Sequence, residues 1–366
     1  MLLKLNSGKC KSYQDTIRNF LQELLEKKTV DAVLVPLRNP VTGNVAQALV
    51  TDERGLNEAD PLAPLQMVNA AKILVELTRE ESGRKIAAVL RPCEARATIE
   101  LIKLKQVLGD NLVMIGYDCP GAYDAKAYFE MTEKEGPGAD IAGRCLKEFT
   151  NGDARSLRPA CALCAKFTGE SADLNLAWIG VEVPEVGLET NSEKGLKLAE
   201  GLQAGEVKEN PGRTKIIAKI SGQRREKEQD PGENIRALIG KCLRCYNCRE
   251  VCPLCYCKEC LLKPEKMGYT SERHLKRAIK KGRIKMPADT LLYHLTKMNH
   301  MAVSCVACGL CEQACPVGLP LGKIYRKMGK DIQALFGYIP GMSVNDELPF
   351  VTFKEDELPD VEDVKK

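Results

Sequence analysis

The sequence predicts two domains: an α/β domain with a mostly parallel sheet, followed by a small, mainly helical, cysteine-rich domain. In the first 200 residues, short apolar runs alternate with amphipathic segments, which is the pattern of strands and helices in a mostly parallel sheet. From residue 236 onward the β-branched runs disappear, and the helical stretches carry Lys and Arg. A chain of 366 residues is long enough for two or three domains.

The elements of the first domain follow from apolar periodicity. Spacing of three to four residues predicts helices at residues 13–27, 64–79 and 94–106. Short apolar runs predict buried strands at residues 31–37, 44–50, 85–90 and 111–117. Two further apolar runs lie at 174–183 and 214–220. We therefore expect an α/β domain at residues 1–200.

The second half of the chain divides into a connector, a helical domain and a tail. Residues 201–235 are rich in Lys, Glu, Gly, Gln and Asp and are expected to be a connector. A helical domain is expected at 236–340, with helices at 273–283, 287–298 and 320–337. Residues 341–366 are expected to be an extended acidic tail, because eight acidic and three basic side chains lie within 346–366.

Composition excludes several classes of protein. The net charge of +4 is too balanced for a nucleic-acid binder by charge alone, although residues 241–300 carry fourteen basic and five acidic side chains. No apolar run reaches the roughly 18 residues that a membrane helix needs, and the start of the chain lacks the features of a signal peptide. We expect a cytoplasmic protein. In that reducing setting, its 17 cysteines bind metal more often than each other.

The strongest motif occurs twice. Each run has three cysteines at two-residue gaps, then a fourth followed by proline; the eight are Cys242, Cys245, Cys248, Cys252, Cys305, Cys308, Cys311 and Cys315. This spacing is the ferredoxin pattern for two 4Fe–4S clusters, in which the fourth cysteine of each run binds the other cluster. Structural zinc, the alternative, does not need three such cysteines followed by Cys-Pro.

The expected ligand sets cross between the two runs. We call Cys242, Cys245, Cys248 and Cys315 the first ligand set. We call Cys305, Cys308, Cys311 and Cys252 the second ligand set. The separation of the runs, with helices between them, resembles the helical ferredoxin modules of respiratory and heterodisulfide reductase subunits.

Four cysteines of the first domain form a third candidate site. Cys93 and Cys119 directly follow predicted strands, and Cys161 and Cys164 form a C-x-x-C pair. Loops after parallel strands converge on one edge of a sheet. The spacing leaves two alternatives open, a third 4Fe–4S cluster or inert thiols beside a redox pair.

The same segments carry a family resemblance. LRPCEARATIELIKLK, GYDCPG and RPACALCAKFTGESADLNLAWIGVE are similar to the motifs of the coenzyme F420 hydrogenase/dehydrogenase beta-subunit family, which includes formate dehydrogenase beta subunits. The resemblance covers residues 30–185 and implies one 4Fe–4S cluster on Cys93, Cys119, Cys161 and Cys164. It also implies FAD and hydride exchange with a deazaflavin. Against FAD, residues 10–21 lack the glycines that open the first helix in the family.

The remaining cysteines and histidines have weaker signals. Cys255, Cys257 and Cys260 lie within six residues and have two alternatives. They bind zinc or a further cluster, with a ligand such as His274, or they pack around the first cluster and tune its potential. Cys10 and Cys145 are expected to be isolated thiols. We expect surface or partner-contact roles for all three histidines, His274, His294 and His300.

These observations predict an iron–sulfur electron-transfer subunit of an anaerobic oxidoreductase complex of the hydrogenase, formate dehydrogenase or heterodisulfide reductase type. Electrons are expected to pass between the cluster of the first domain, with FAD as an open question, and the two ferredoxin-type clusters. The alternative is a flavin-free, non-catalytic relay and assembly subunit. The expected partners are other subunits of a redox complex, and ferredoxin is a further candidate. The sequence identifies no catalytic residue.

Overall fold

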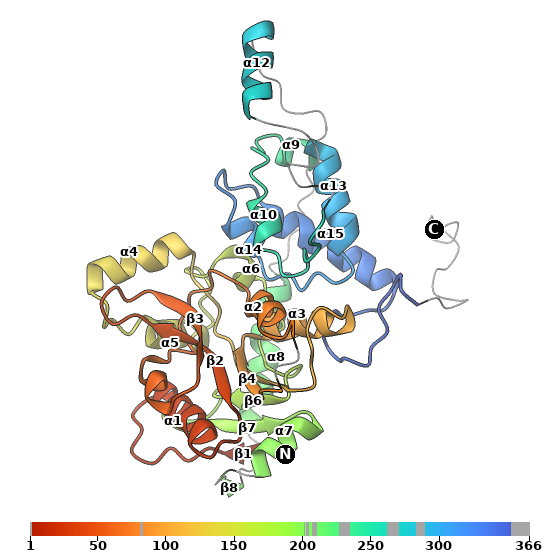
Figure 1. The fold of residues 1–366 in the computed structure, drawn as a ribbon. Coiled ribbons are helices and arrows are strands. Elements are labelled where there is room, and N and C mark those ends of the chain that lie inside the picture. The colour runs from red at the N-terminus through yellow and green to blue at the C-terminus, as the bar shows by residue number, and fades with distance from the viewer. Residues whose placement is uncertain are drawn as a thin grey trace. The chain divides into compact units, whose positions relative to one another are not determined.

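The computed structural model describes residues 2–80, 83–200, 202, 205–206, 211–226, 235–260, 262, 271–282 and 290–352 (Figure 1). The chain divides into two compact units. Unit 1 contains Met1–Gln229 and Pro340–Leu348, and unit 2 contains Asp230–Ile339 and Pro349–Lys366.

Unit 1 is built on an eight-stranded mixed sheet with the order β3-β2-β4-β5-β6-β7-β1-β8. The strands are β1 (Leu2–Lys4), β2 (Ala32–Arg38), β3 (Val45–Val50), β4 (Ile86–Leu90), β5 (Leu112–Tyr117), β6 (Leu174–Ala177), β7 (Gly187–Thr190) and β8 (Gly205–Glu206). The centre, β2-β4-β5-β6, is parallel, and every other pairing is antiparallel.

The prediction of a mostly parallel sheet is therefore wrong at both edges. A short connection can join only antiparallel neighbours, because a parallel pair needs a crossover of a dozen or more residues. Residues 39–44 join β2 to β3, and residues 178–186 join β6 to β7. Both links are too short for a crossover helix, so the pairs they join are antiparallel.

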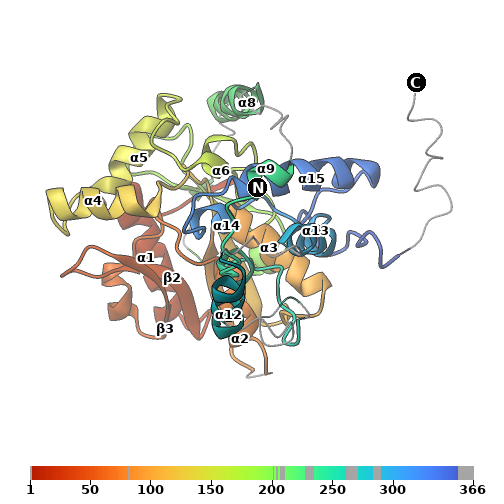
Figure 2. The ribbon, with the colours of Figure 1, turned by 90° about the horizontal axis from the view of Figure 1, so that it is seen from above.

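The helices of unit 1 match the predictions at 13–27 and 94–106, whereas the prediction at 64–79 was too long. The elements are α1 (Tyr13–Glu26), the 3-10 helix η1 (Glu53–Glu58), α2 (Ala70–Leu77), α3 (Pro92–Lys103), α4 (Ala125–Glu135), α5 (Ile141–Thr150), α6 (Pro159–Ala162), α7 (Glu193–Glu200) and α8 (Pro211–Glu226). Helix α2 begins later than predicted because the Asn69 side chain caps it, accepting a hydrogen bond from Ala71 N at 3.0 Å. Figure 2 shows α4 and α5 lying away from α2 and α3.

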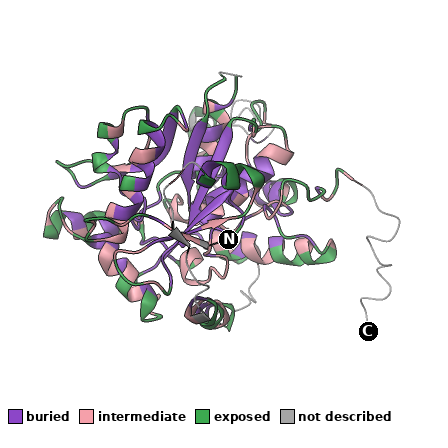
Figure 3. Ribbon diagram, turned by 90° about the horizontal axis from the view of Figure 1, so that it is seen from below, coloured by how far each residue is buried: buried purple, intermediate pink, exposed green. Residues whose placement is uncertain are grey.

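The core of unit 1 forms on one face of the sheet. Side chains at alternate positions of the central strands, such as Val33, Val89 and Ile115, pack with Ile17 and Leu21 of α1. The central strands β4 and β5 are buried along their whole length, and β2 is buried over its first five residues, whereas β3 is partly exposed (Figure 3). Burial on both faces explains why these strands appear in the sequence as continuous apolar runs.

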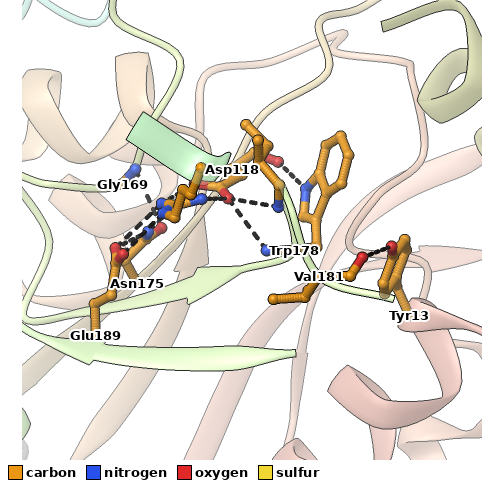
Figure 4. Close-up of polar contacts among 9 residues, drawn as sticks. Tyr13, Asp118, Gly169, Asn175, Trp178, Val181 and Glu189 are labelled. Atoms are coloured by element: carbon orange, nitrogen blue, oxygen red, sulfur yellow. Dashed lines mark hydrogen bonds and ion pairs between the residues drawn. The ribbon is translucent and has the colours of Figure 1, made fainter. Parts of the chain in front are cut away.

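Helix α8 lies within the predicted connector but belongs to unit 1. Its Arg213 forms ion pairs with Asp118, which directly follows β5, and with Glu189 of β7. Asp118 is fully buried and also accepts hydrogen bonds from the backbone N–H groups of Trp178 and Ile179, both at 3.1 Å (Figure 4). These contacts fix α8 to the carboxyl end of the sheet.

Unit 2 is helical among its described residues. Its helices are α9 (Ile235–Leu238), α10 (Asn247–Glu250), α12 (Ser271–Lys281), α13 (Thr290–Met301), α14 (Leu310–Gln313) and α15 (Leu321–Leu335). The three longest of these, α12, α13 and α15, correspond to the three predicted helical stretches. Among the residues the structure describes, no helix has the length and apolar character needed to cross a membrane.

The first part of the predicted acidic tail packs on α3. Arg96 Nε donates to Pro340 O, and Gly341 N donates to the Glu100 carboxylate, both at 2.8 Å. Residues 340–348 are therefore part of unit 1. The remainder of the predicted tail, residues 353–366, lies outside the described residues.

Candidate metal centres

The two cysteine runs of unit 2 fold into the same loop. Arg244 and Tyr246 in the first run have φ values of 55° and 64°. Ala307 and Gly309, at the equivalent positions of the second run, have φ values of 55° and 74°. Two left-handed residues in three positions curl each backbone tightly before a one-turn helix, α10 or α14.

The curled loops direct backbone N–H groups at sulfur. Arg244 N donates to Cys242 Sγ at 3.4 Å. At Cys305, burial raises the pKa of the thiol, and a backbone hydrogen bond from Ala307 offsets part of that rise. Cys315 Sγ likewise accepts from Leu319 N at 3.4 Å. Such bonds stabilise thiolate over thiol, which is the form that binds iron.

Thiols of both runs interact in the two predicted sets. Burial raises the pKa of Cys242, and the charges of Cys248, Cys245 and Cys315 raise it further. Burial also raises the pKa of Cys311. The charges of Cys308, Cys252 and Cys305 act on Cys311 in the same direction. The fourth cysteine of each run is therefore close enough to thiols of the other run to act on their pKa values.

The second ligand set surrounds a cavity. Cys252, Cys305, Cys308 and Cys311 all line it, and the other lining residues include Leu254, Met301, Val306 and Tyr325. Four thiols around an apolar cavity, with backbone N–H groups on sulfur, fit a four-iron cluster. Within the described ranges, no three Cys, His, Asp or Glu side chains are grouped closely enough to hold a single metal ion, which needs a tighter group of ligands than a four-iron cluster does.

Helix α13 supplies a polar face to these thiols. His294 Nε2 lies 3.3 Å from Cys242 Sγ, and the hydroxyl of Tyr293 lies 3.4 Å from Cys248 Sγ. The other ring nitrogen of His294 contacts the hydroxyl of Tyr325 at 3.0 Å. The predicted surface role of His294 is wrong, because this side chain is 1% exposed and burial lowers its pKa to about 4. The ring is therefore neutral near pH 7.

The four cysteines of the third candidate site, here called the unit 1 thiols, lie at the carboxyl ends of β4 and β5 and on the loop that contains α6. Cys93 is the second residue of α3, Cys119 follows β5, and Cys161 lies in α6. Burial raises the pKa of Cys119, and the charges of Cys161 and Cys164 raise it further. These thiols are therefore close enough to interact.

Two buried arginines face the unit 1 thiols. Arg91, 5% exposed, donates from Nη1 to Cys119 Sγ at 3.2 Å. Arg158, 4% exposed, donates from Nε to Cys161 Sγ at 3.1 Å. Burial raises the pKa of Cys161, but the Arg158 guanidinium outweighs it and holds that pKa below its usual value. Buried guanidinium groups need negative charge. The Glu94 carboxylate acts on Arg91, and the thiolates of a bound cluster would supply the rest.

An unpartnered hydroxyl completes this site. Tyr117 is 1% exposed, and its Oη has no hydrogen-bond partner among the residues that the structure describes. Burial raises its pKa strongly, with the charges of Cys119, Glu94 and Cys93 adding to that rise and Arg91 opposing it. The buried Tyr117 hydroxyl needs a hydrogen-bond acceptor. The sulfide atoms of a cluster bound to the four thiols would provide one. The unit 1 thiols therefore fit a 4Fe–4S cluster.

Sequence reasoning missed these supporting residues. Arg91 had a local signal, because it directly precedes the Pro-Cys that opens α3. Arg158 had the same local signal, because it precedes the Pro that opens α6 and contacts Cys161 three residues later. Tyr293 and His294 had none, because each reaches its thiol only through the tertiary fold.

The extra cysteines after the first run differ from one another. Cys255 is partly buried, and its thiol donates to Cys252, which lowers the pKa of Cys252. Cys257 is exposed, and its carbonyl accepts from Arg249 at 3.2 Å. Cys260 forms a hydrogen bond with the Arg249 side chain. The side chain of His274, the predicted fourth ligand, lies outside the described atoms.

The two isolated cysteines also differ. Cys10 Sγ accepts a hydrogen bond from Asn19 Nδ2 at 3.1 Å. Cys145 lies on the buried face of α5, where burial, with a smaller contribution from the charge of Cys119, raises its pKa to about 12. Neither belongs to the ligand sets or to the unit 1 thiols.

Comparison with known proteins shows the family of this chain. Residues 238–319 match the family described as a 4Fe-4S dicluster domain. The F420-dependent formate dehydrogenase subunit beta of Methanocaldococcus jannaschii is 30% identical, over 89% of this chain and 90% of that protein. The F420-dependent formate dehydrogenase 1 subunit beta of Methanococcus maripaludis is 27% identical, over 94% of each chain.

A chain of the F420-reducing nickel–iron hydrogenase complex from Methanosarcina barkeri also superposes on this chain, with a TM-score of 0.47 and 14% identity. The match covers 62% of this chain and 89% of that chain. The sequence identity to the first relative carries the assignment. The chain belongs to the coenzyme F420 hydrogenase/dehydrogenase beta-subunit family, and it is an iron–sulfur electron-transfer subunit.

Proposed function

We propose that the chain is the beta subunit of a formate dehydrogenase-type complex and holds three 4Fe–4S clusters. The first ligand set holds one, the second ligand set holds another, and the unit 1 thiols hold the third. The observation that supports the proposal best is that Cys252 of the first run lines the same cavity as Cys305, Cys308 and Cys311 of the second run. A cytoplasmic location is part of the proposal.

The chain's own residues hold and tune these clusters. Clusters, when bound, carry single electrons. Backbone N–H groups, His294 and Tyr293 contact sulfur in unit 2, and Arg91 and Arg158 do so in unit 1. Hydrogen bonds and charge at sulfur set cluster potentials. Apolar walls such as those of Leu254, Met301 and Val306 exclude water from the second site.

Metal analysis tests the number of clusters. The full chain is purified without oxygen, and its iron and acid-labile sulfide are measured. Three clusters correspond to about twelve irons per chain. Cys311→Ser and Cys119→Ser should each lose about four irons, whereas Cys10→Ser, outside every set, should lose none. Eight irons in the wild type, or no loss on changing Cys119, would remove the third cluster from the proposal.

The flavin question separates two functions. The family resemblance implies FAD, but the start of α1 is covered by the chain itself. Tyr13 Oη donates to Val181 O at 2.7 Å, and the Tyr13 ring centroid lies 5.8 Å from that of Trp178. The family's opening glycines would leave this place free. This contact favours the second candidate, a flavin-free relay in which a partner supplies the two-electron chemistry.

Flavin content decides between them. The purified protein is denatured with acid, and released flavin is quantified by fluorescence. Near one flavin per chain means a catalytic subunit, for which a deazaflavin and nicotinamides are the first substrates to assay. Near zero, even after incubation with FAD, means a relay.

The partner is proposed from the relatives and from charge. The relatives are named as subunits of formate dehydrogenases, so we expect a catalytic subunit of that kind. Helix α12 carries Arg273, Lys276, Arg277, Lys280 and Lys281. An acidic electron carrier such as ferredoxin suits this helix. Formate-dependent reduction of the clusters in the purified complex tests the first partner, and salt-sensitive ferredoxin binding tests the second.

A further inference from the structure

A buried lysine lies on the polar face of α13. Lys297 is one turn beyond Tyr293 and His294 on this helix, and it is 1% exposed. It ranks among the largest fully buried side chains of the described residues. A buried ammonium group is costly unless negative charge compensates it.

The surroundings of Lys297 contain sulfur rather than carboxylate. Its Nζ donates to Cys255 Sγ at 3.1 Å and lies 3.7 Å from Met301 Sδ. It also lies 5.3 Å from the ring centroid of Tyr325. No Asp or Glu among the described residues forms an ion pair with it.

The negative charges that face Lys297 come from both ligand sets. Burial lowers its pKa, but the charges of Cys252, Cys255, Cys248 and Cys311 outweigh burial and raise it. Cys248 belongs to the first ligand set, and Cys252 and Cys311 belong to the second.

Cys255, which the Lys297 Nζ contacts directly, belongs to neither set. Met301 and Tyr325, which Lys297 also contacts, line the cavity of the second ligand set. Tyr293, one turn earlier on α13, lies 3.4 Å from Cys248 Sγ of the first set. One buried cation therefore lies close to the thiols of both ligand sets.

We propose that Lys297 is a positioning residue whose permanent charge is shared by the two clusters of unit 2. Reduction adds one electron, and hence one negative charge, to a cluster without making or breaking a bond. A fixed cation nearby stabilises the reduced form of each cluster. Lys297 thus raises both reduction potentials together. This inference rests on the cluster assignment of the proposed function.

The test compares four variants of the full chain by redox titration with EPR detection. Lys297→Met and Lys297→Gln remove the charge, Lys297→Arg keeps it, and Lys323→Met removes an exposed lysine of α15 as the matched control. The two clusters are identified by their loss in Cys315→Ser and Cys311→Ser. Iron content is measured in every variant.

Loss of the charge should lower both potentials. At a fixed potential we expect the ratio of reduced to oxidised cluster to fall about tenfold for each cluster, which is about 59 mV for a one-electron couple. Lys297→Arg and Lys323→Met should keep the wild-type values. Since a merely structural role would reduce iron content without moving the potentials, the potentials are the deciding measurement.

Several results would overturn the inference. They are loaded Met or Gln variants with unchanged potentials, a shift in one cluster alone, or an Arg variant that shifts as far as Met. If Met and Gln fail to load, the Arg variant decides: normal loading with wild-type potentials supports a charge role, and failure to load means packing. Absence of unit 2 clusters from the wild type would instead defeat the proposed function.

Discussion

Tyr246 and Gly309 occupy equivalent positions in the two cysteine runs and share a left-handed backbone, with φ values of 64° and 74°. Glycine adopts this conformation without strain, whereas tyrosine does so at a cost. Tyr246 is held by an edge-to-face contact with Tyr293, whose ring centroid is 5.2 Å away. The loop conformation is therefore imposed by the site in one run and permitted by glycine in the other.

Gly309→Ala should destabilise unit 2. A side chain at a positive φ costs about 1 kcal/mol, and the loop would direct its N–H groups at sulfur less well. We expect a lower free energy of unfolding and faster loss of iron to a chelator. Gly222, within α8 at an ordinary φ and with open space around it, is the matched control. Gly222→Ala should stabilise by roughly 0.5–1 kcal/mol; equal effects of both changes would contradict the loop argument.

Arg158→Gln should weaken the unit 1 site. Without the guanidinium, the pKa of Cys161 rises and its thiolate is harder to form. Loss of a group that supports a metal ligand typically costs about 10- to 100-fold in metal affinity. Retention of iron during chelator challenge measures this, and alkylation of Cys161 in the metal-free protein should slow. Arg155→Gln, which removes an exposed arginine paired with Asp153, should change neither quantity; a similar loss there would refute the role of Arg158.

Arg213→Met should destabilise unit 1 by about 3 kcal/mol, because it leaves the Asp118 carboxylate buried without its ion-pair partner. Chemical denaturation measures the loss. Combining it with Asp118→Asn should recover part of the stability, since the uncompensated charge is then gone. Lys215→Met, on the exposed side of the same helix, should have little effect. No recovery in the double variant would mean that packing of α8, rather than charge, dominates.

Cys145 makes the stability of unit 1 fall at high pH. Burial raises its pKa from 9.0 to about 12, so the folded state keeps a proton that the unfolded state releases. Its contribution is fully present below pH 9 and is lost as pH rises toward 12. Across this range, the free energy of unfolding of the wild type should therefore fall by up to about 1.4 kcal/mol per pH unit relative to that of Cys145→Ala. Denaturation curves at several pH values measure the difference, and parallel pH dependences would disprove it.

Local patterns were sufficient for most of the fold. Four elements lie close to their predicted bounds: the strands at 85–90 and 111–117 and the helices at 13–27 and 94–106. A strand buried on both faces gives a continuous apolar run, and a helix buried along one stripe gives an apolar residue every three to four positions, so both patterns can be recognised in the sequence. The short strands β7, β1 and β8 on one side of the sheet were missed, because each is four residues or shorter. Helix α8 was predicted to be part of a connector, because its polar composition gives no clear apolar face in the sequence.

The sequence by itself determined which cysteines are candidates, because the spacing of ligands within one loop is a local property of the chain. It also determined the order of the two units and the family. Only the tertiary structure placed Lys297 between thiols of both ligand sets, Arg91 and Arg158 on the unit 1 thiols, and His294 on Cys242. Except for Arg158, which lies three residues before Cys161, these residues come from segments far apart in the sequence, and packing decides which buried charge or donor reaches which sulfur.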